Sequence, residues 1–316
     1  MARRRLSQQQ KSRIKAAQHA DKNAHPHGLV VSHQGGRILV ELEPGKNLEC
    51  KIKSNLGSIV CGDRVAIESS ASGEHRVMAI LPRDNLLQRI DGFGKLRSVA
   101  ANLSQLVVCL AIAPEPNLLM LDQYLLSAEQ QRIEAIILIN KIDMPSSDDI
   151  ATEITDIYQP LGYEMLYTSV KTGQGMAQFR DKLTDELTIL CGVSGVGKSS
   201  LISWLLPDET IKIASISAAN EEGRHTTRTS RLYHLAGGGD LIDTPGVRGF
   251  SPFIDTSRPL AHGFREILQY SSGCRFHNCK HLDEPNCAVI DAVNKGDINP
   301  IRFQHYLKLL AEASSA

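Results

Sequence analysis

The feature that most limits how this chain can fold is a glycine-rich loop between an apolar run and a helix-forming run. In LTILCGVSGVGKSSLISWLL, Gly192, Gly197, Lys198 and Ser199 fit the pattern G-x-x-x-x-G-K-[ST]. Backbone N–H groups of such a loop surround phosphate oxygens at a helix N-terminus, the lysine reaches the β- and γ-phosphates, and the serine binds Mg²⁺. The sequence therefore predicts an α/β nucleotide-binding domain. The expected nucleotide contacts are Gly192, Val193, Ser194, Gly195, Val196, Gly197, Lys198, Ser199 and Ser200.

A second phosphate motif, Asp243-Thr244-Pro245-Gly246, ends a short apolar run downstream and matches D-x-x-G. In this pattern the aspartate holds Mg²⁺ through water and the glycine N–H contacts the γ-phosphate. The hydroxyl-rich segment EEGRHTTRTS lies between the two motifs, and Thr227 is the expected switch threonine, with Thr226 as the alternative. The predicted magnesium ligands are Ser199, Thr227 and Asp243.

The sequence leaves open which group positions the attacking water. Many GTPases carry a glutamine directly after the D-x-x-G glycine, but Val247 stands there and cannot form a side-chain hydrogen bond. His225 could orient the water instead, or it could be an exposed loop histidine. Lys198, Thr227, Gly246 and His225 are therefore the candidate catalytic residues.

A base-binding site is predicted by Asn140-Lys141-Ile142-Asp143, which follows the apolar run EAIILI. The Asp143 carboxylate can accept hydrogen bonds from both N1–H and N2–H of guanine, and adenine offers neither donor on that edge. Asn140 is expected to tie this loop to the phosphate loop, and the stem of Lys141 to cover the base. Ser169, Val170 and Lys171 form the second expected base loop, which directs a backbone N–H to guanine O6.

The order of these motifs is rotated. In ordinary small GTPases the phosphate loop comes first and the base loops last, whereas here the base loops at 140–143 and 168–171 precede the phosphate loop. Domain termini often lie close together, so such a rotation is physically feasible. We expect a circularly permuted GTPase domain over residues 99–256.

Other segments flank this domain. Short strand-like runs separated by turns over 28–82 predict a small all-β barrel of the oligonucleotide-binding (OB) type, with an SH3-like barrel as the alternative. Residues 83–98 are expected to connect the two domains. Residues 1–27 form a basic arm, expected to be disordered or to bind a polyanion, with seven of the 35 basic side chains and one of the 35 acidic ones.

The C-terminal segment 257–316 combines helical patterns with a Cys/His cluster. Cys274, Cys279, His281 and Cys287 have the spacing C-x4-C-x-H-x5-C, typical of a closed, structural zinc site. His277 is an alternative fourth ligand. The other cysteines, scattered through apolar runs, are expected in the core. No apolar run approaches the roughly 20 residues of a membrane span, and a cytoplasmic protein that binds no membrane is expected.

Together these features resemble the ribosome small-subunit-dependent GTPase A (RsgA, also called YjeQ) family, over residues 28 to the end. The motifs that carry the resemblance are GVSGVGKSS, GRHTT, DTPG, NKID and the zinc spacing. The resemblance implies a monomer that binds GTP, GDP and the small ribosomal subunit late in its maturation. It also implies rRNA contacts through the barrel and the zinc domain, and GTP hydrolysis stimulated by the subunit. The alternatives are an RNA-binding module with negligible turnover and an ATP-driven RNA remodeller, which Asp143 disfavours.

Overall fold

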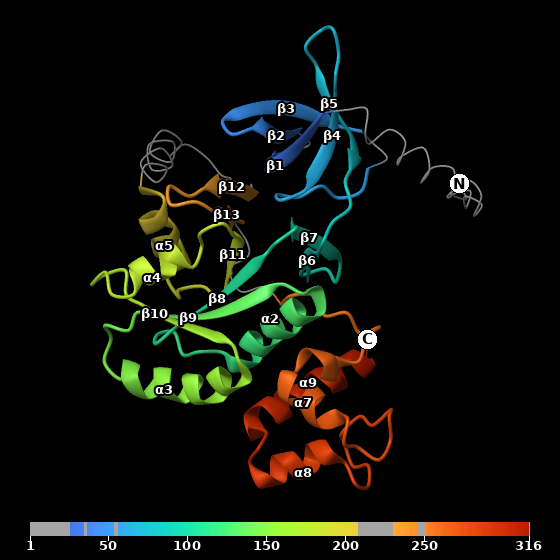
Figure 1. Cartoon of the computed structure of the whole chain (residues 1–316), viewed down its shortest axis with the longest axis vertical. Coiled ribbons are helices and arrows are strands. Elements are labelled where there is room, and N and C mark those ends of the chain that lie inside the picture. The colour runs from blue at the N-terminus through green and yellow to red at the C-terminus, as the bar shows by residue number, and fades with distance from the viewer. Residues whose placement is uncertain (1–25, 35–36, 54–55, 208–229, 245–250, 316) are drawn as a thin grey trace, which may run out of the picture.

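The computed structural model describes residues 26–34, 37–53, 56–207, 230–244 and 251–315. Figure 1 shows three parts: a small β-barrel, an α/β unit with helices on both faces of its sheet, and a group of helices at the C-terminal end. This arrangement confirms the fold class predicted from the sequence. Among the described residues, no helix is long and apolar enough to cross a membrane.

The barrel consists of five strands in a closed circuit. They pair in the order β1-β2-β3-β5-β4 and close through β1–β4, with β3 and β5 parallel. This circuit is the strand order of an OB-type barrel, so the OB prediction holds over the SH3-like alternative. The strands are β1 (His27–Gln34), β2 (Arg37–Glu43), β3 (Lys46–Ile52), β4 (Arg64–Ser69) and β5 (His75–Ile80).

The α/β unit is built on six strands in the order β10-β9-β8-β11-β13-β12, of which only β12 is antiparallel to its neighbour. Every residue of β8 is buried, as expected for a parallel strand covered on both faces. The strands are β8 (Gln105–Ala111), β9 (Glu134–Asn140), β10 (Glu164–Thr168), β11 (Leu187–Cys191), β12 (Ser230–His234) and β13 (Asp240–Asp243).

Helices cover this sheet in two layers. One hydrophobic cluster packs α2 (Leu118–Gln131) and α3 (Ser147–Tyr158) on one face, and a second packs α4 (Met176–Asp181) and α5 (Lys198–Leu205) on the other. A short 3-10 turn, η1 (Gln159–Leu161), ends α3. Because both faces are covered, polar side chains at the carboxyl ends of the strands are the ones left to meet a ligand.

The segment expected as a simple connection forms a β-hairpin of β6 (Leu86–Ile90) and β7 (Leu96–Ala101). At its entrance Arg83 donates to the buried carboxylate of Asp63, with Nε 2.6 Å from Oδ1. The hairpin thus joins the barrel to β8 as an ordered element.

The barrel and the α/β sheet are also joined edge to edge, because β1 pairs with β12. Ser32 lies opposite Arg231, and His33 lies opposite Ser230. Eleven strands therefore form one continuous sheet that includes both units (Figure 1).

The C-terminal helices are η2 (Leu260–Gly263), α7 (Arg265–Ser271), α8 (Ala288–Lys295) and α9 (Pro300–Ser315). The apolar pattern of PLAHGFREILQY predicts one helix over this run, and that prediction is wrong, because the chain is extended at Phe264 between η2 and α7. Gly263 lies so close to α2 that an added Cβ would be 1.9 Å from Leu126 Cδ1. Only glycine therefore fits this close approach to α2.

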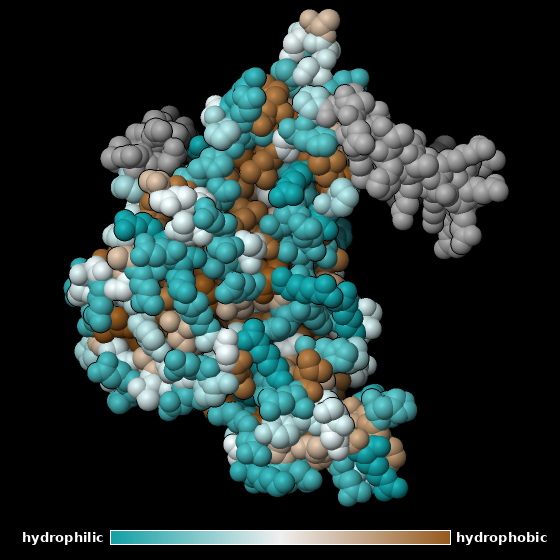
Figure 2. Space-filling model, viewed as in Figure 1, coloured by the Kyte–Doolittle hydropathy of each residue, from teal (hydrophilic) through white to brown (hydrophobic). Residues whose placement is uncertain are grey.

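Most of the face in Figure 2 is hydrophilic, and its hydrophobic atoms form separate small groups. The large apolar side chains are mainly in four buried clusters: one in the barrel, two on the sheet faces and one among the C-terminal helices.

Candidate nucleotide and metal sites

The glycine-rich loop leaves the carboxyl end of β11 and enters α5 at Lys198, as its sequence predicts. Gly192 and Gly197 have positive φ values of 137° and 97°. An added Cβ would lie 2.2 Å from the Cys109 carbonyl oxygen at Gly192, and 2.3 Å from Asn140 Nδ2 at Gly197. The loop therefore requires glycine at both positions.

The Lys198 side chain folds back over this loop. Its Nζ donates to the carbonyl oxygens of Gly192 and Val193, at 2.6 and 2.7 Å. An ammonium held at the glycine-rich loop, beside the N-terminus of α5, is placed to contact phosphate oxygens.

The first base loop is joined to the phosphate loop by two side chains. The buried Asn140 amide donates to the Val196 carbonyl oxygen at 2.9 Å and accepts a hydrogen bond from Thr168 at 3.1 Å. Lys141 Nζ donates to the carbonyl oxygens of Ala113 and Gly195, each at 2.6 Å. Asn140 therefore makes the connection expected for it.

Asp143 is oriented by the second base loop. Ser169 donates its hydroxyl to Asp143 Oδ1 at 2.7 Å, and Lys171 Nζ lies 3.5 Å from Oδ2. The hydrogen bond from Ser169, aided by the Lys171 charge, lowers the pKa of the Asp143 carboxyl. The group is thus an ionised acceptor at neutral pH, which is the state that guanine recognition requires.

A cavity of about 420 Å³ lies between the second base loop and α5. It is lined by Val170, Ser199, Ser200, Ser203 and Trp204, so it brings predicted base-binding and phosphate-binding residues together. The sequence reading missed Ser203 and Trp204. Their place one turn beyond Ser199 and Ser200 on α5 was a usable signal, and Trp204 is the only tryptophan in the chain.

Asp243 ends β13, which runs parallel to β11, so this carboxylate lies at the same sheet edge as the phosphate loop. The next residue, Thr244, has a buried hydroxyl with no hydrogen-bond partner among the described residues. Thr226, Thr227, His225, Gly246 and Val247 lie outside the described residues.

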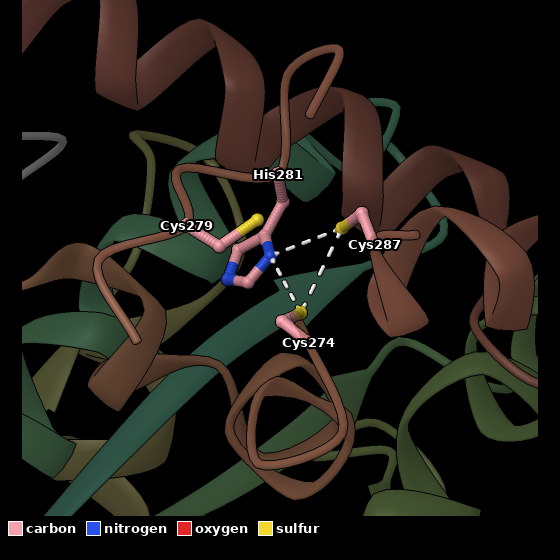
Figure 3. A group of neighbouring side chains, drawn as sticks. All are labelled: Cys274, Cys279, His281 and Cys287. Carbon is pink, nitrogen blue, oxygen red and sulfur yellow. Dashed lines mark hydrogen bonds between the residues drawn. The ribbon is translucent and has the colours of Figure 1, made fainter. Parts of the chain in front are cut away.

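Three cysteines and one histidine converge among the C-terminal helices (Figure 3). The candidate ligand atoms of Cys274, Cys279, His281 and Cys287 all lie within 4.8 Å of one another. Cys274 Sγ is 3.8 Å from Cys287 Sγ, and His281 Nδ1 is 3.6 and 3.3 Å from these two sulfurs. A tetrahedron with metal–sulfur bonds of about 2.3 Å has sulfur–sulfur edges of about 3.8 Å. The four residues therefore fit a tetrahedral metal ion.

The imidazole of His281 is held from its other side. Its Nε2 lies 3.2 Å from Ser271 Oγ, which leaves Nδ1 facing the cysteines (Figure 3). Such an outer partner fixes the ring orientation of a metal-binding histidine. His277, the alternative ligand, is exposed and does not belong to this group.

The other four cysteines are buried and free, as expected for core residues. Burial raises the pKa of Cys50 to about 11 and that of Cys61 and Cys109 to about 12. These thiols are therefore protonated at neutral pH and are not reactive nucleophiles.

The phosphate loop, the base loops and their rotated order along the chain together define a circularly permuted GTPase with an OB-type barrel and a C-terminal Cys/His cluster. The RsgA GTPase family model matches residues 80–252. A small ribosomal subunit biogenesis GTPase RsgA from Saccharophagus degradans is 38% identical over 98% of this chain and 97% of its own length. The same-named protein from Photorhabdus laumondii is 40% identical over 90% of this chain and 84% of its own length. The chain belongs to the RsgA GTPase family and is a GTP-hydrolysing enzyme.

Solved structures agree with this assignment. YjeQ from Thermotoga maritima matches with a TM-score of 0.72 and 31% identity, covering 92% of this chain and 99% of that one. YloQ, described as a circularly permuted GTPase, matches with a TM-score of 0.68 and 28% identity, covering 92% and 96%. The family assignment favours hydrolysis over a binding module with negligible turnover.

Proposed function

We propose that this GTPase acts in late maturation of the small ribosomal subunit and that the subunit stimulates its GTP hydrolysis. The observation that carries the proposal is full-length similarity to relatives named small ribosomal subunit biogenesis GTPase. The similarity spans the barrel, the GTPase unit and the Cys/His segment alike, over 98% of this chain and 97% and 96% of these two relatives' own length.

Guanine selection is assigned to the two base loops. Asp143 accepts from N1–H and N2–H of guanine, and Ser169, Val170 and Lys171 surround O6. Support comes from the 2.7 Å bond that aims Asp143 and from the Asn140 bond to the phosphate loop. A loop held by side-chain bonds before the ligand arrives loses less entropy on binding.

The phosphate site is assigned to residues 192–200, with Ser199, Thr227 and Asp243 as Mg²⁺ ligands. When bound, Mg²⁺ neutralises charge that develops on the phosphates during transfer. The position of Asp243 beside the phosphate loop supports this assignment. So does the Thr244 hydroxyl, because a buried hydroxyl without a partner costs free energy that a polar ligand can remove.

The residue that orients the attacking water is assigned outside the phosphate loop and the two base loops. Val247 offers no hydrogen-bonding side chain after Gly246, so we assign His225 to orient the attacking water when the small subunit is bound. Free enzyme should consequently turn over slowly.

The Cys/His cluster is assigned to one structural Zn²⁺. Three thiolates and an imidazole are a standard zinc set, and four protein ligands leave no open position for substrate. The sulfur–sulfur and sulfur–nitrogen separations support this assignment.

The parts of the chain around the GTPase domain are assigned to RNA contact. The barrel (28–82), the zinc domain (257–316) and the basic arm (1–27) contact rRNA around the GTPase domain (99–256), and residues 83–98 connect barrel and GTPase domain. The protein acts as a monomer in the cytoplasm, where ribosomal subunits mature.

Sedimentation tests whether the small ribosomal subunit is the binding partner. Purified protein is mixed with isolated small or large subunits and a non-hydrolysable GTP analogue, and complexes are separated on sucrose gradients. We expect stoichiometric co-migration with small subunits only, and weaker association when GDP replaces the analogue. Equal association with both subunits would overturn the proposal.

A further inference from the structure

A second cavity lies on the α/β unit, between α3 and β10 and beside the first base loop. β10 is the strand at the end of the sheet farthest from the barrel, and α3 packs beside it (Figure 1). The volume of the cavity is about 480 Å³, within the roughly 300–1,000 Å³ of small-molecule sites. Its lining residues are Ile142, Ser147, Asp148, Ala151, Thr152, Thr155, Asp156, Tyr167 and Gln174. None of these residues is a predicted nucleotide or metal ligand.

The cavity extends along α3. Six of its lining residues recur at helical spacing from Ser147 to Asp156, so they form one stripe on the surface of this helix. Asp148 and Asp156 lie at opposite ends of the stripe, eight residues apart, which is about 12 Å along the helix axis. The cavity thus suits an elongated ligand.

The ends of the cavity are acidic, whereas its middle is apolar and carries hydroxyl groups. Asp148 and Asp156 are exposed at the two ends. Between them, Ile142 and Tyr167 are partly buried against the hydrophobic cluster of this sheet face and form an apolar floor. The hydroxyls of Thr155 and Tyr167 are hydrogen-bonded to each other at 2.5 Å, which fixes the aromatic ring in the floor.

The charge on α3 is all of one sign. The helix has four carboxylates and no basic residue, and no cation in the described part of the chain forms an ion pair with any of them. Asp156 lies in the last turn, where the partial negative charge of the helix C-terminus disfavours a carboxylate. A cation from outside the chain would offset this cost, so the charge points to a cationic ligand.

These features together select a linear polyamine. Ammonium groups at its ends would pair with Asp148 and Asp156, an internal ammonium would donate to the Thr152 hydroxyl, and the methylene groups would lie on the apolar floor. Three backbone bonds extend at most about 3.6 Å, so an extended aliphatic chain of about ten bonds spans the distance between the two carboxylates. A metal ion would use neither the apolar floor nor both ends of the cavity.

The cavity shares its walls with both base loops. Ile142 directly precedes Asp143, and its N–H donates to the Thr168 carbonyl oxygen at 3.2 Å. The Gln174 carbonyl oxygen accepts a hydrogen bond from the Ser169 N–H at 3.0 Å, and Ser169 is the residue that donates to Asp143. An occupant of the cavity therefore contacts the segments that orient Asp143.

We propose that this cavity binds a linear polyamine and that its occupation strengthens the binding of guanine nucleotides. A ligand that contacts both base loops restricts their motion, so the nucleotide loses less entropy when it binds. By linkage, the nucleotide strengthens polyamine binding by the same factor. The coupling rests on the proposed function of the two loops in guanine binding, whereas the polyamine site itself rests on the cavity and its charges.

Calorimetric titration of the nucleotide-free protein with spermidine tests the site. Asp148→Asn and Asp156→Asn should each weaken binding about tenfold, because each removes the charged partner of one ammonium group. Asp149→Asn is the matched control, since it makes the same change on the same helix but outside the cavity, and it should bind spermidine like the parent. Butylamine, which has a single charge, should bind the parent at least about tenfold more weakly than spermidine.

The coupling is measured as the affinity for GDP with and without spermidine. Polyamines also pair with phosphates in solution, so the double variant Asp148→Asn/Asp156→Asn supplies the reference. Spermidine should raise the GDP affinity of the parent several-fold and should leave that of the double variant unchanged.

Equal spermidine binding by the parent and the double variant would overturn the polyamine site. An equal loss in Asp149→Asn would reduce the effect to general attraction by an acidic helix, and tighter binding of a lysine tripeptide than of spermidine would assign the cavity to a basic peptide; either result overturns the proposal. The same effect of spermidine on GDP affinity in the parent and the double variant would overturn the coupling alone. If the parent binds no GDP, the proposed base site fails, while the spermidine titration still decides on the cavity.

Discussion

Arg302 on α9 is a single side chain on which the placement of the C-terminal helices depends. It is fully buried, with Nη1 2.5 Å from Asp122 on α2 and Nε 2.7 Å from Glu266 on α7. Tyr158 also donates to Asp122, at 2.7 Å, so the network includes α3. A buried cation between two carboxylates is stable only while all three are present.

Replacing Arg302 by methionine should therefore destabilise the protein strongly. Two carboxylates would lose their buried partner, and breaking a buried pair costs about 3–5 kcal/mol. Urea unfolding measures the loss. Arg258→Gln is the control, because its ion pair with Asp255 is exposed and should be worth about 1 kcal/mol or less. Equal stability of the two variants would contradict the role given to Arg302.

Asp143 is the residue that should decide base specificity. In Asp143→Asn the side-chain amide presents a donor to guanine's own donors, so GTP affinity should fall about ten- to a hundredfold. Xanthosine triphosphate, with a carbonyl where guanine has N2, should recover much of the loss. Calorimetric titration with both nucleotides measures this, and unchanged GTP affinity would remove Asp143 from the base site.

These two residues differ in how visible they are in the sequence. Asp143 could be found because N-K-x-D is a local pattern at the end of an apolar strand. The role of Arg302 could not be found from the sequence, because its partner Asp122 is 180 residues away and no local pattern near either residue marks the pair. Local motifs predicted the nucleotide and metal residues, whereas contacts between distant elements required the structure.

At the scale of elements, β12 connects the nucleotide unit to the barrel. His234 at its end bridges the two, with Nε2 2.7 Å from Glu41 on β2 and Nδ1 2.6 Å from Asp240 on β13. Burial alone would lower the pKa of His234, but the hydrogen bonds to Asp240 and Glu41 outweigh it and raise the pKa above its ordinary 6.5.

A raised pKa in the folded state sets the direction of a pH effect. The stabilisation from charged His234 is fully present below about pH 6.5 and is lost as the pH rises through the raised value. The difference in urea midpoint between parent and His234→Gln should thus be larger at about pH 6 than at about pH 9. His262→Gln, at an exposed histidine, should show no such trend. A constant difference would mean that His234 is not charged in the bridge.

The chain that follows the D-x-x-G segment is fixed to neighbouring elements. Phe253 N–H donates to the Gln88 carbonyl oxygen on β6 at 2.8 Å, and Gln130 on α2 exchanges two hydrogen bonds with the backbone of Asp255, at 2.9 and 3.0 Å. The sequence predicted that this chain runs directly from the nucleotide unit into the Cys/His region. The anchoring on β6 and α2 was not predictable, because backbone pairing leaves no residue pattern.

The metal should stabilise only the C-terminal helices and the Cys/His segment between them. Thiolate ligation contributes folding free energy to small metal domains, so Cys279→Ala should speed hydrogen exchange after about residue 257 and leave GTP affinity unchanged. Cys50→Ala, at a buried barrel cysteine, should not affect exchange in that segment. Elemental analysis that finds no zinc in protein purified without chelator would reject the zinc assignment.

At the scale of the whole molecule, one continuous sheet and one buried ion network hold three units together. The barrel meets the GTPase unit through β1 and β12, and the C-terminal helices meet it through Arg302. The three units and their order could be predicted from motif spacing and strand patterns. Their mutual contacts could not be predicted, because they join residues that are far apart in the sequence.

The measurement that tests this account most directly is the rate of GTP hydrolysis with and without isolated ribosomal subunits. Free enzyme should turn over on the order of 10⁻⁴ to 10⁻² s⁻¹, as unassisted GTPases do. Small subunits should raise that rate by orders of magnitude, large subunits should do little, and His225→Ala should abolish most of the rise with nucleotide affinity nearly intact. Equal stimulation of parent and His225→Ala would assign water positioning elsewhere. A parent rate that small subunits leave unchanged would contradict the central claim.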